Sequence, residues 1–374
     1  MRLLLALTFA LSIVAGASHA AEPHPPQRVF ISGHSLTDNP LPVYLAQVAA
    51  SLGQPMQWNR QYVVGSSILQ RSRGEGQESG WRGYSTGYNR TGEGLDVISE
   101  LRHPRTTDGQ PYDTLIITEQ HGVLDSIVFN DTVRYLRHYH ERFIAGNADG
   151  QTWFYEPWLG VIDKSDPSRW IAYERAAAPL WQCVLSRINT SLAAEGRPDR
   201  IEPLPASAAL VSLVERAMRG QVAGLVTPSG GKVLDRIFHD TVHTTPLGAY
   251  YLALSSYAAM YHRSPVGAWA PDGMDATLAA SLQKLAWEAV AAERAARRPL
   301  PLDQCSAYMK RFSTQYFAHM RDDYWAQQSG NAAYLTYRRL RHELTWRWRL
   351  WHQFDDDPFR YDPGTDRQHW LPAP

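Results

Sequence analysis

Between residues 28 and 262, short apolar runs alternate with longer stretches that have the periodicity of amphipathic helices. The runs are expected to be strands, and they lie at residues 28–33, 57–64, 113–118, 152–158 and 200–205. The helical stretches lie at residues 41–52, 126–144, 168–194 and 246–261. Strands that alternate with helices are typical of a parallel sheet with helices on both faces. The sequence therefore predicts an α/β fold, a three-layer α/β/α arrangement with a mainly parallel central sheet.

The pattern changes after about residue 267, where only helical periodicity remains, over residues 275–298 and 305–354. We therefore expect an α/β domain over residues 21–266 and a helical C-terminal extension over residues 267–374 that packs on it. The chain has 374 residues, 44% of them hydrophobic, which is enough apolar material for one large core.

The first residues have the composition of a secretory signal peptide. A basic start, Met1-Arg2, precedes an apolar stretch at 3–14 and small residues that end at Ala20. Since that stretch is shorter than the roughly 20 residues needed to span a bilayer, we expect cleavage after Ala20 and export to the periplasm or the medium. In such an oxidising compartment the two cysteines, Cys183 and Cys305, either form one disulfide or stay apart, because sequence alone does not give their distance.

Charge and ligand spacing argue against several classes of partner. Lys plus Arg and Asp plus Glu both number 37, so no net basic field would attract nucleic acid. His138 and His140 lie two apart on an expected helix and point in different directions, which makes them poor co-ligands. We expect no metal, no cofactor, no nucleic-acid partner and no transmembrane segment after removal of the signal.

Two short blocks carry residues suited to nucleophilic catalysis. Gly33-His34-Ser35 ends the first strand, so Ser35 would lie at the carboxyl edge of the sheet, where open α/β sheets bind ligands. His243 follows Asp240 by three residues, so one short segment can supply a base and the carboxylate that orients it. The alternative is that Ser35 merely caps the helix that starts near Pro40, and that His243 is an ordinary histidine at a helix start.

These blocks resemble those of the SGNH, or GDSL-like, hydrolases, and the resemblance covers roughly residues 28–262. Family members carry the nucleophilic serine in a Gly-x-Ser turn after the first strand, and here His34 stands where an aspartate is usual. The last family block, Asp-x-x-His, is present without change as Asp240-Thr241-Val242-His243. The resemblance implies an SGNH/flavodoxin-like fold in which Ser35 is the nucleophile, His243 the base and Asp240 its partner.

The family's oxyanion donors are matched in part. Gly65 stands after the second strand, where a glycine normally offers its backbone N–H. The third block, Gly-x-Asn, is replaced by Thr118-Glu119-Gln120-His121-Gly122. We assign the missing amide to Gln120, with His121 as the second candidate and as a candidate substrate contact.

Three further features bear on substrate binding. The polar loop over residues 71–94 follows a strand end and is a candidate lid. Glu156 and Trp158 follow the fourth strand and are candidate substrate contacts, with core packing as the alternative.

Aromatic and aliphatic residues recur at helical spacing near the C-terminus. They are Tyr334, Tyr337, Leu340, Leu344, Trp348 and Trp351, and we expect them to pack the last helix onto the domain. As an alternative use of this helix, its arginines would contact a membrane surface or an acidic polysaccharide; they are Arg338, Arg339, Arg341, Arg347 and Arg349.

Taken with the resemblance, these features predict an exported serine esterase that acts through an acyl-enzyme, with O-acetyl groups on a carbohydrate or polysaccharide as the expected substrate. The fold alone does not set the substrate. A lipid or aryl esterase, an O-acyltransferase and a noncatalytic carbohydrate-binding protein on the same fold are the alternatives.

Overall fold

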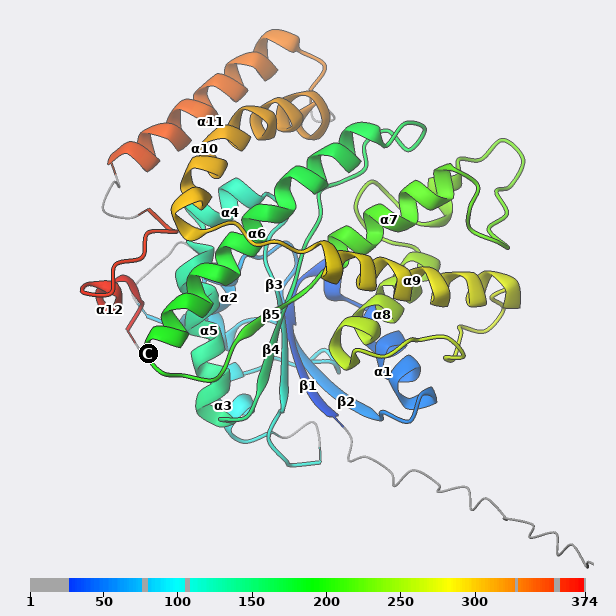
Figure 1. Cartoon of the computed structure of the whole chain (residues 1–374), viewed down its shortest axis with the longest axis horizontal. Coiled ribbons are helices and arrows are strands. Elements are labelled where there is room, and N and C mark those ends of the chain that lie inside the picture. The colour runs from blue at the N-terminus through cyan, green and yellow to red at the C-terminus, as the bar shows by residue number, and fades with distance from the viewer. Residues whose placement is uncertain (1–26, 76–79, 105–107, 327–328, 353–356, 373–374) are drawn as a thin grey trace, which may run out of the picture.

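A computed structural model describes residues 27–75, 80–104, 108–326, 329–352 and 357–372 (Figure 1). The expected signal peptide, residues 1–20, lies outside this part of the chain. A single sheet has the strand order β2-β1-β3-β4-β5, and every neighbouring pair is parallel. The strands are β1 Gln27–Gly33, β2 Met56–Tyr62, β3 Thr114–Thr118, β4 Gln151–Tyr155 and β5 Ile201–Leu204. The prediction of a parallel central sheet is confirmed.

Helices cover both faces of the sheet, which gives the predicted three layers (Figure 1). Neighbouring side chains of β1 enter different cores, Val29 and Ile31 on one face and Phe30 on the other. The Val29 face packs against α1 Leu41–Ser51, α7 Ala206–Met218, α8 Pro246–Tyr261 and α9 Ala276–Ala296. The Phe30 face packs against α2 Ile68–Arg73, α3 Val97–Arg102, α4 Val123–Phe129, α5 Thr132–Gly146 and α6 Ser168–Ala194.

Two points of the helix prediction need correction. The expected helix over residues 126–144 is two helices, α4 and α5, because Asp131 between them adopts a left-handed backbone conformation with φ of 51°. Helix α7 is absent from the sequence prediction, although its buried residues Leu210, Leu213 and Val214 have helical spacing. Helix α9, which follows residue 267, packs on α8 and shares its core, and the division of the chain at residue 267 stays a prediction.

The loop over residues 71–94 is joined to the domain at several points in its described part. It contains the end of α2 and a 3-10 helix, Arg82–Ser85. The Gln61 side-chain amide donates to the carbonyl oxygen of Gly83 at 2.9 Å, and the ring of Trp81 stacks on that of His138. Its role as a lid stays a prediction.

The helical region expected over residues 305–354 is confirmed, but it is divided into separate helices. The chain forms α10 Leu302–His319, a π-helical turn at Met320–Trp325 and then α11 Ala332–His352, which runs back beside α10 (Figure 1). Asn331 directly precedes α11, and its side-chain oxygen accepts from the backbone N–H of Tyr334 at 3.0 Å. A last short helix, α12, spans Asp366–His369.

Cys183 of α6 and Cys305 of α10 form a disulfide, which decides the question that the sequence leaves open. The bridge joins residues 122 apart in the sequence. It therefore ties the C-terminal helices to the α/β layers and restricts the unfolded chain.

The packing predicted for the last helix is also wrong. Most of the residues expected to contact the domain are exposed, namely Tyr334, Tyr337, Leu340, Leu344 and Trp348, and the side chain of Trp351 lies outside the description. Leu335 and Trp346 make the buried contacts instead. Both faces of α11 carry apolar residues, so periodicity alone could not choose between them. None of the described helices is long and apolar enough to cross a membrane.

Candidate active site

Ser35 lies at the carboxyl end of β1, on the turn that the sequence predicts. Gly33 ends the strand, and Ser35 begins a 3-10 helix that runs to Thr37. A Cβ atom on Gly33 would lie 2.0 Å from the hydroxyl oxygen of Thr37, so only glycine fits where the chain turns. The backbone N–H of Thr37 donates to the carbonyl of His34 at 2.9 Å and closes the turn.

His34 holds this turn against the end of β3. Its Nε2 lies 2.9 Å from the carbonyl oxygen of Glu119, which can only accept, so Nε2 carries the proton. That assignment leaves Nδ1 to accept from the N–H of Leu36 at 3.4 Å. Burial lowers the pKa of His34 well below its usual value, and the ring is therefore neutral. His34 therefore has a structural role, since both of its ring nitrogens hydrogen-bond to the backbone.

The structure brings together Ser35, His243 and Asp240. The Nε2 atom of His243 lies 2.9 Å from the hydroxyl oxygen of Ser35, and its Nδ1 lies 2.6 Å from Oδ2 of Asp240. Oδ1 of Asp240 accepts from the backbone N–H groups of Val242 and His243 at 2.7 Å each. Partial burial raises the pKa of Asp240, but these hydrogen bonds outweigh it and lower the pKa to about 2. Asp240 is therefore a carboxylate that fixes the imidazole.

The segment after β4 supports the loop that carries Asp240 and His243. Trp158 donates its indole N–H to the carbonyl oxygen of Val242 at 2.9 Å, and the N–H of Val161 donates to the carbonyl of Thr241 at 2.6 Å. Glu156 and Trp158 are each only 1% exposed. Their predicted contact with substrate is therefore corrected: both side chains are covered by protein, and Trp158 acts on the loop from beneath.

The predicted oxyanion donors lie beside one another. Gly65 has a left-handed backbone with φ of 62°, and its carbonyl oxygen accepts from the side-chain amide of Gln120 at 3.1 Å. Asn130 donates to the other end of the Gln120 amide at 3.2 Å. Among the described residues, the backbone N–H groups of Ser35 and Gly65 have no hydrogen-bond acceptor. Those two N–H groups and the second amide hydrogen of Gln120 are thus available to a ligand.

His121 directly follows Gln120 in the chain. Its ring stacks on His34, with centroids 5.1 Å apart and planes 28° from parallel. Burial, with a smaller contribution from the nearby His243, lowers the pKa of His121 to about 4. It is a neutral ring next to the catalytic group and can hydrogen-bond a ligand without adding charge.

The sequence does not predict two buried charged residues near the site, Arg71 and Glu119. Arg71 is fully buried and donates to the hydroxyl of Ser32 at 3.0 Å, to both oxygens of Ser66 at 2.8 and 2.9 Å, and to the carbonyl of Thr118. Its guanidinium therefore joins β1, the loop after β2 and the end of β3, the three segments that supply Ser35, Gly65 and Gln120. Because these partners come from separate segments, no local sequence signal identifies Arg71.

Glu119 is the counter-charge. Its Oε1 accepts from the backbone N–H groups of Ile68 and Gln120 at 3.1 and 2.7 Å, and its Oε2 accepts from Thr132 at 2.9 Å. Burial raises the pKa of Glu119, and the attraction of Arg71 opposes that rise. The carboxylate thus fixes the backbone of Gln120.

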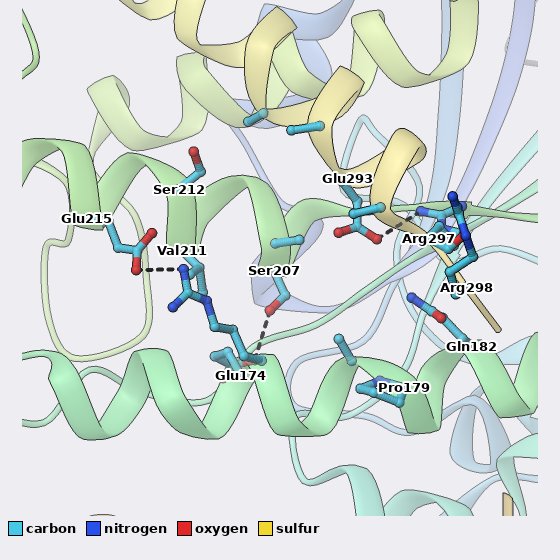
Figure 2. A pocket seen from close by; sticks show the side chains of 16 residues that line it. Glu174, Pro179, Gln182, Ser207, Val211, Ser212, Glu215, Glu293, Arg297 and Arg298 are labelled. Carbon is cyan, nitrogen blue, oxygen red and sulfur yellow. Dashed lines mark hydrogen bonds and ion pairs between the residues drawn. The ribbon is translucent and has the colours of Figure 1, made fainter. Parts of the chain in front are cut away.

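A hollow of about 460 Å³ lies away from this site, between α6, α7 and α9 (Figure 2). Glu174 faces it from α6, with Oε1 accepting from the N–H of Leu159 at 2.7 Å and Oε2 from the hydroxyl of Ser207 at 2.8 Å. Burial raises the pKa of Glu174 to about 8, and that of Glu156 likewise to about 8. Both side chains therefore hold a proton at neutral pH.

The raised pKa values predict a loss of stability as pH rises. In the unfolded chain these carboxyl groups release their protons near the usual value of 4.5, whereas the folded protein keeps them to about 8. Between those values the folded state binds more protons, so its stability falls with increasing pH and then levels off. The glutamine of Glu174→Gln can still accept from the N–H of Leu159 and can donate to the Ser207 hydroxyl, and it does not titrate. We expect this variant to unfold at a higher temperature than the unaltered protein at pH 8 and at a similar one at pH 4.

Thermal unfolding followed by circular dichroism across this pH range tests the prediction. Glu215→Gln is the matched control, because Glu215 lines the same hollow but pairs with the exposed Arg175. The control should keep the pH slope of the unaltered protein. Parallel slopes for Glu174→Gln and the unaltered protein would contradict the assignment of a buried, protonated Glu174.

Within the described residues, no three or more His, Cys, Asp or Glu side chains are grouped so as to hold a metal ion.

Comparison with known proteins gives little similarity. No family model matches the chain, and no curated protein matches it. Among solved structures, the fold is similar to that of a DUF4886 family protein from Bacteroides uniformis, with 15% sequence identity and a TM-score of 0.49. The matched region covers 71% of this chain and 95% of that protein.

Proposed function

We propose that this chain is an exported serine esterase of the SGNH type. The observation that carries the proposal is the continuous hydrogen-bonded series from Ser35 through His243 to Asp240, which joins residues that lie 208 apart in the sequence. A serine hydroxyl is a weak nucleophile at neutral pH, and a base at hydrogen-bond distance is what it needs to attack a carbonyl. The carboxylate of Asp240 stabilises the positive imidazole that forms.

The chemical steps follow from this geometry. The Ser35 oxygen attacks the ester carbonyl while its proton passes to Nε2 of His243, and a tetrahedral oxyanion forms. His243 then returns the proton to the leaving alcohol oxygen as the carbon–oxygen bond breaks, which leaves an acyl-serine. Water, deprotonated by the same nitrogen, attacks the acyl group and releases the acid and free Ser35.

The oxyanion in this proposal is held by the backbone N–H groups of Ser35 and Gly65 and by the side-chain amide of Gln120. Donors of this kind are each worth about 3 to 4 kcal/mol in the transition state. The hydrogen bond from Gln120 to the Gly65 carbonyl supports this assignment, because it holds the amide next to the second backbone donor.

The substrate we propose is an O-acetyl ester of a carbohydrate. The side chains of His243 and Asp240 are 42% and 49% exposed, so the base that protonates the leaving alcohol lies in an open position. An open alcohol side suits an ester group displayed on a large polar chain such as a polysaccharide. The neutral rings of His34 and His121 stack on each other in the neighbouring loops and add no charge that would favour a charged acyl group.

The test combines a covalent probe with a substrate series. A fluorophosphonate should label one peptide, the one that contains Ser35, and leave the nearby Ser66 and Ser67 unmodified. Acetate release from acetylated xylan and hydrolysis of p-nitrophenyl acetate should exceed hydrolysis of the long-chain p-nitrophenyl esters. Faster turnover of long acyl chains would favour a lipid esterase, and transfer of the acetyl group to an added glycan would show a transferase.

The same assay distinguishes the side-chain donors. Gln120→Ala should lose more of kcat than His121→Ala if Gln120 holds the oxyanion, and the reverse order would move that role to His121. Sugar binding with no labelling and no turnover would favour the noncatalytic alternative.

A further inference from the structure

One face of α11 carries a row of exposed apolar side chains, which we call the α11 stripe. Its members recur every three or four residues and therefore share one side of the helix. They are Tyr334, Tyr337, Leu340, Leu344 and Trp348, with exposed fractions of 48%, 61%, 53%, 65% and 60%. Single exposed apolar residues are ordinary, but a continuous row with two leucines and a tryptophan marks a contact surface.

The opposite face of α11 fixes the helix to the domain. Trp346 is buried and donates its indole N–H to the carbonyl of Leu124 at 3.4 Å, and Nε2 of His342 lies 3.0 Å from Oδ1 of Asp125. Leu335 is buried on the same side. Since these contacts hold the helix, turning the stripe inward would require breaking them, and the stripe is a lasting feature of the surface.

The charge of α11 is strongly positive. Over residues 332–352 it contains five arginines and a single acidic residue, Glu343. Glu343 pairs with Arg347 at 2.8 Å and with Arg339 at 3.7 Å. Arg341 and Arg347 are exposed beside the stripe, so the apolar row is bordered by positive charge.

We propose that the α11 stripe is a docking surface for an anionic lipid bilayer. Leucine side chains gain free energy only where they leave water, and tyrosine and tryptophan rings favour the boundary between head groups and acyl chains. The bordering arginines would meet the negative head groups, each worth about 1 kcal/mol near such a surface. The apolar residues of the stripe and the arginines beside it would thus both contribute to binding the bilayer.

The positive charge of α11 also favours a lipid surface over the other partners that could cover the stripe. A second copy of this chain would bring two positive helices together, and that repulsion opposes pairing through the stripe. An acidic polysaccharide would satisfy the arginines but offers no apolar phase for Leu340 and Leu344. A lipid surface with negative head groups satisfies both.

Helix α11 packs on α4, and α4 begins at Val123, directly after the loop with Gln120 and His121 (Figure 1). The stripe is on the side of α11 that faces away from α4. The proposal concerns binding alone and does not depend on the esterase activity.

Flotation with lipid vesicles tests the proposal, with the chain that starts at residue 21. We expect it to float with vesicles of equimolar phosphatidylcholine and phosphatidylglycerol and not with pure phosphatidylcholine. The triple variant Leu340→Ser, Leu344→Ser, Trp348→Ser should bind roughly tenfold or more weakly, because most of the apolar area inserted is lost. Arg341→Gln with Arg347→Gln should bind more weakly as well.

The control replaces exposed apolar residues elsewhere, Val226→Ser with Val266→Ser, and should bind like the unaltered chain. Because the stripe is exposed, the triple variant should keep its thermal midpoint, which circular dichroism checks. No flotation of the unaltered chain, or equal flotation of the triple variant, would overturn the proposal. A dimer in light scattering that the triple variant abolishes would overturn it in favour of a second copy, and binding to an acidic polysaccharide but not to the vesicles would favour that partner.

Discussion

Replacing Ser35 with alanine should abolish ester turnover and leave the fold intact. Without the hydroxyl no acyl-enzyme can form, and losses of about 10⁴ to 10⁶-fold in kcat are typical when a nucleophile of this kind is removed. Ser35 is only half-buried and Ala fits the 3-10 turn, so the thermal midpoint should stay close to that of the unaltered protein. Initial rates of p-nitrophenyl acetate hydrolysis, measured beside the thermal midpoint, test both parts.

His243→Ala should cost about as much as Ser35→Ala, and the double variant should lose little more, because the two residues act as one unit. The remote and exposed Ser264→Ala is the matched control and should keep full activity. Turnover that survives in Ser35→Ala would show that another group is the nucleophile, and the esterase proposal in its present form would fail.

The sequence was most informative where local pattern determines structure. The run Thr114–Thr118 is apolar enough to be buried on both faces, and it forms the central strand β3. Helix α6, at Ser168–Ala194, matches its predicted range. The break at Asp131 was not visible, because a left-handed conformation at a residue other than glycine depends on tertiary contacts rather than on residue type.

In the candidate site, too, the sequence predicts the residues that are placed by local pattern and misses those whose role depends on tertiary contacts. The sequence predicts that Ser35, Asp240 and His243 form one cluster, and the structure brings them together: Ser35 follows the end of β1, and Asp240 and His243 lie in the short loop before α8. Arg71 and Glu119 were missed because their importance comes from burial, and charged residues usually lie at the surface. Trp158 was placed near the site but given the wrong contact.

Arg71 connects the fold to the proposed chemistry. It bonds to β1, to the loop that carries Gly65 and to the end of β3, while its counter-charge Glu119 holds the N–H of Gln120. The nucleophile and the proposed oxyanion donors therefore share one buried network. A change in this network should disturb stability and activity together.

Arg71→Met should be the most destabilising of the variants considered. It removes the donors to Ser66 and Thr118 and the attraction of Arg71 that opposes the burial of charge on Glu119, and a buried charge left without compensation costs about 3 to 5 kcal/mol in the free energy of unfolding. The loss should grow with pH. Without Arg71 the folded state keeps a proton on Glu119 that the unfolded chain releases, so stability falls as pH rises above the usual glutamate value. Urea unfolding at pH 5 and at pH 8 measures both effects.

Two further variants make the Arg71 prediction specific. Adding Glu119→Gln to Arg71→Met should recover part of the lost stability and remove the extra pH dependence, because glutamine can still accept from Ile68 and Gln120 and carries no charge. Arg73 lies on the same short helix and is only half-buried, over the ring of Trp81. Arg73→Met should therefore lower the free energy of unfolding by about 1 kcal/mol or less. If Arg71→Met were as mild as Arg73→Met, the buried network would not be what holds the strand ends together, and the link between stability and catalysis drawn from it would be lost.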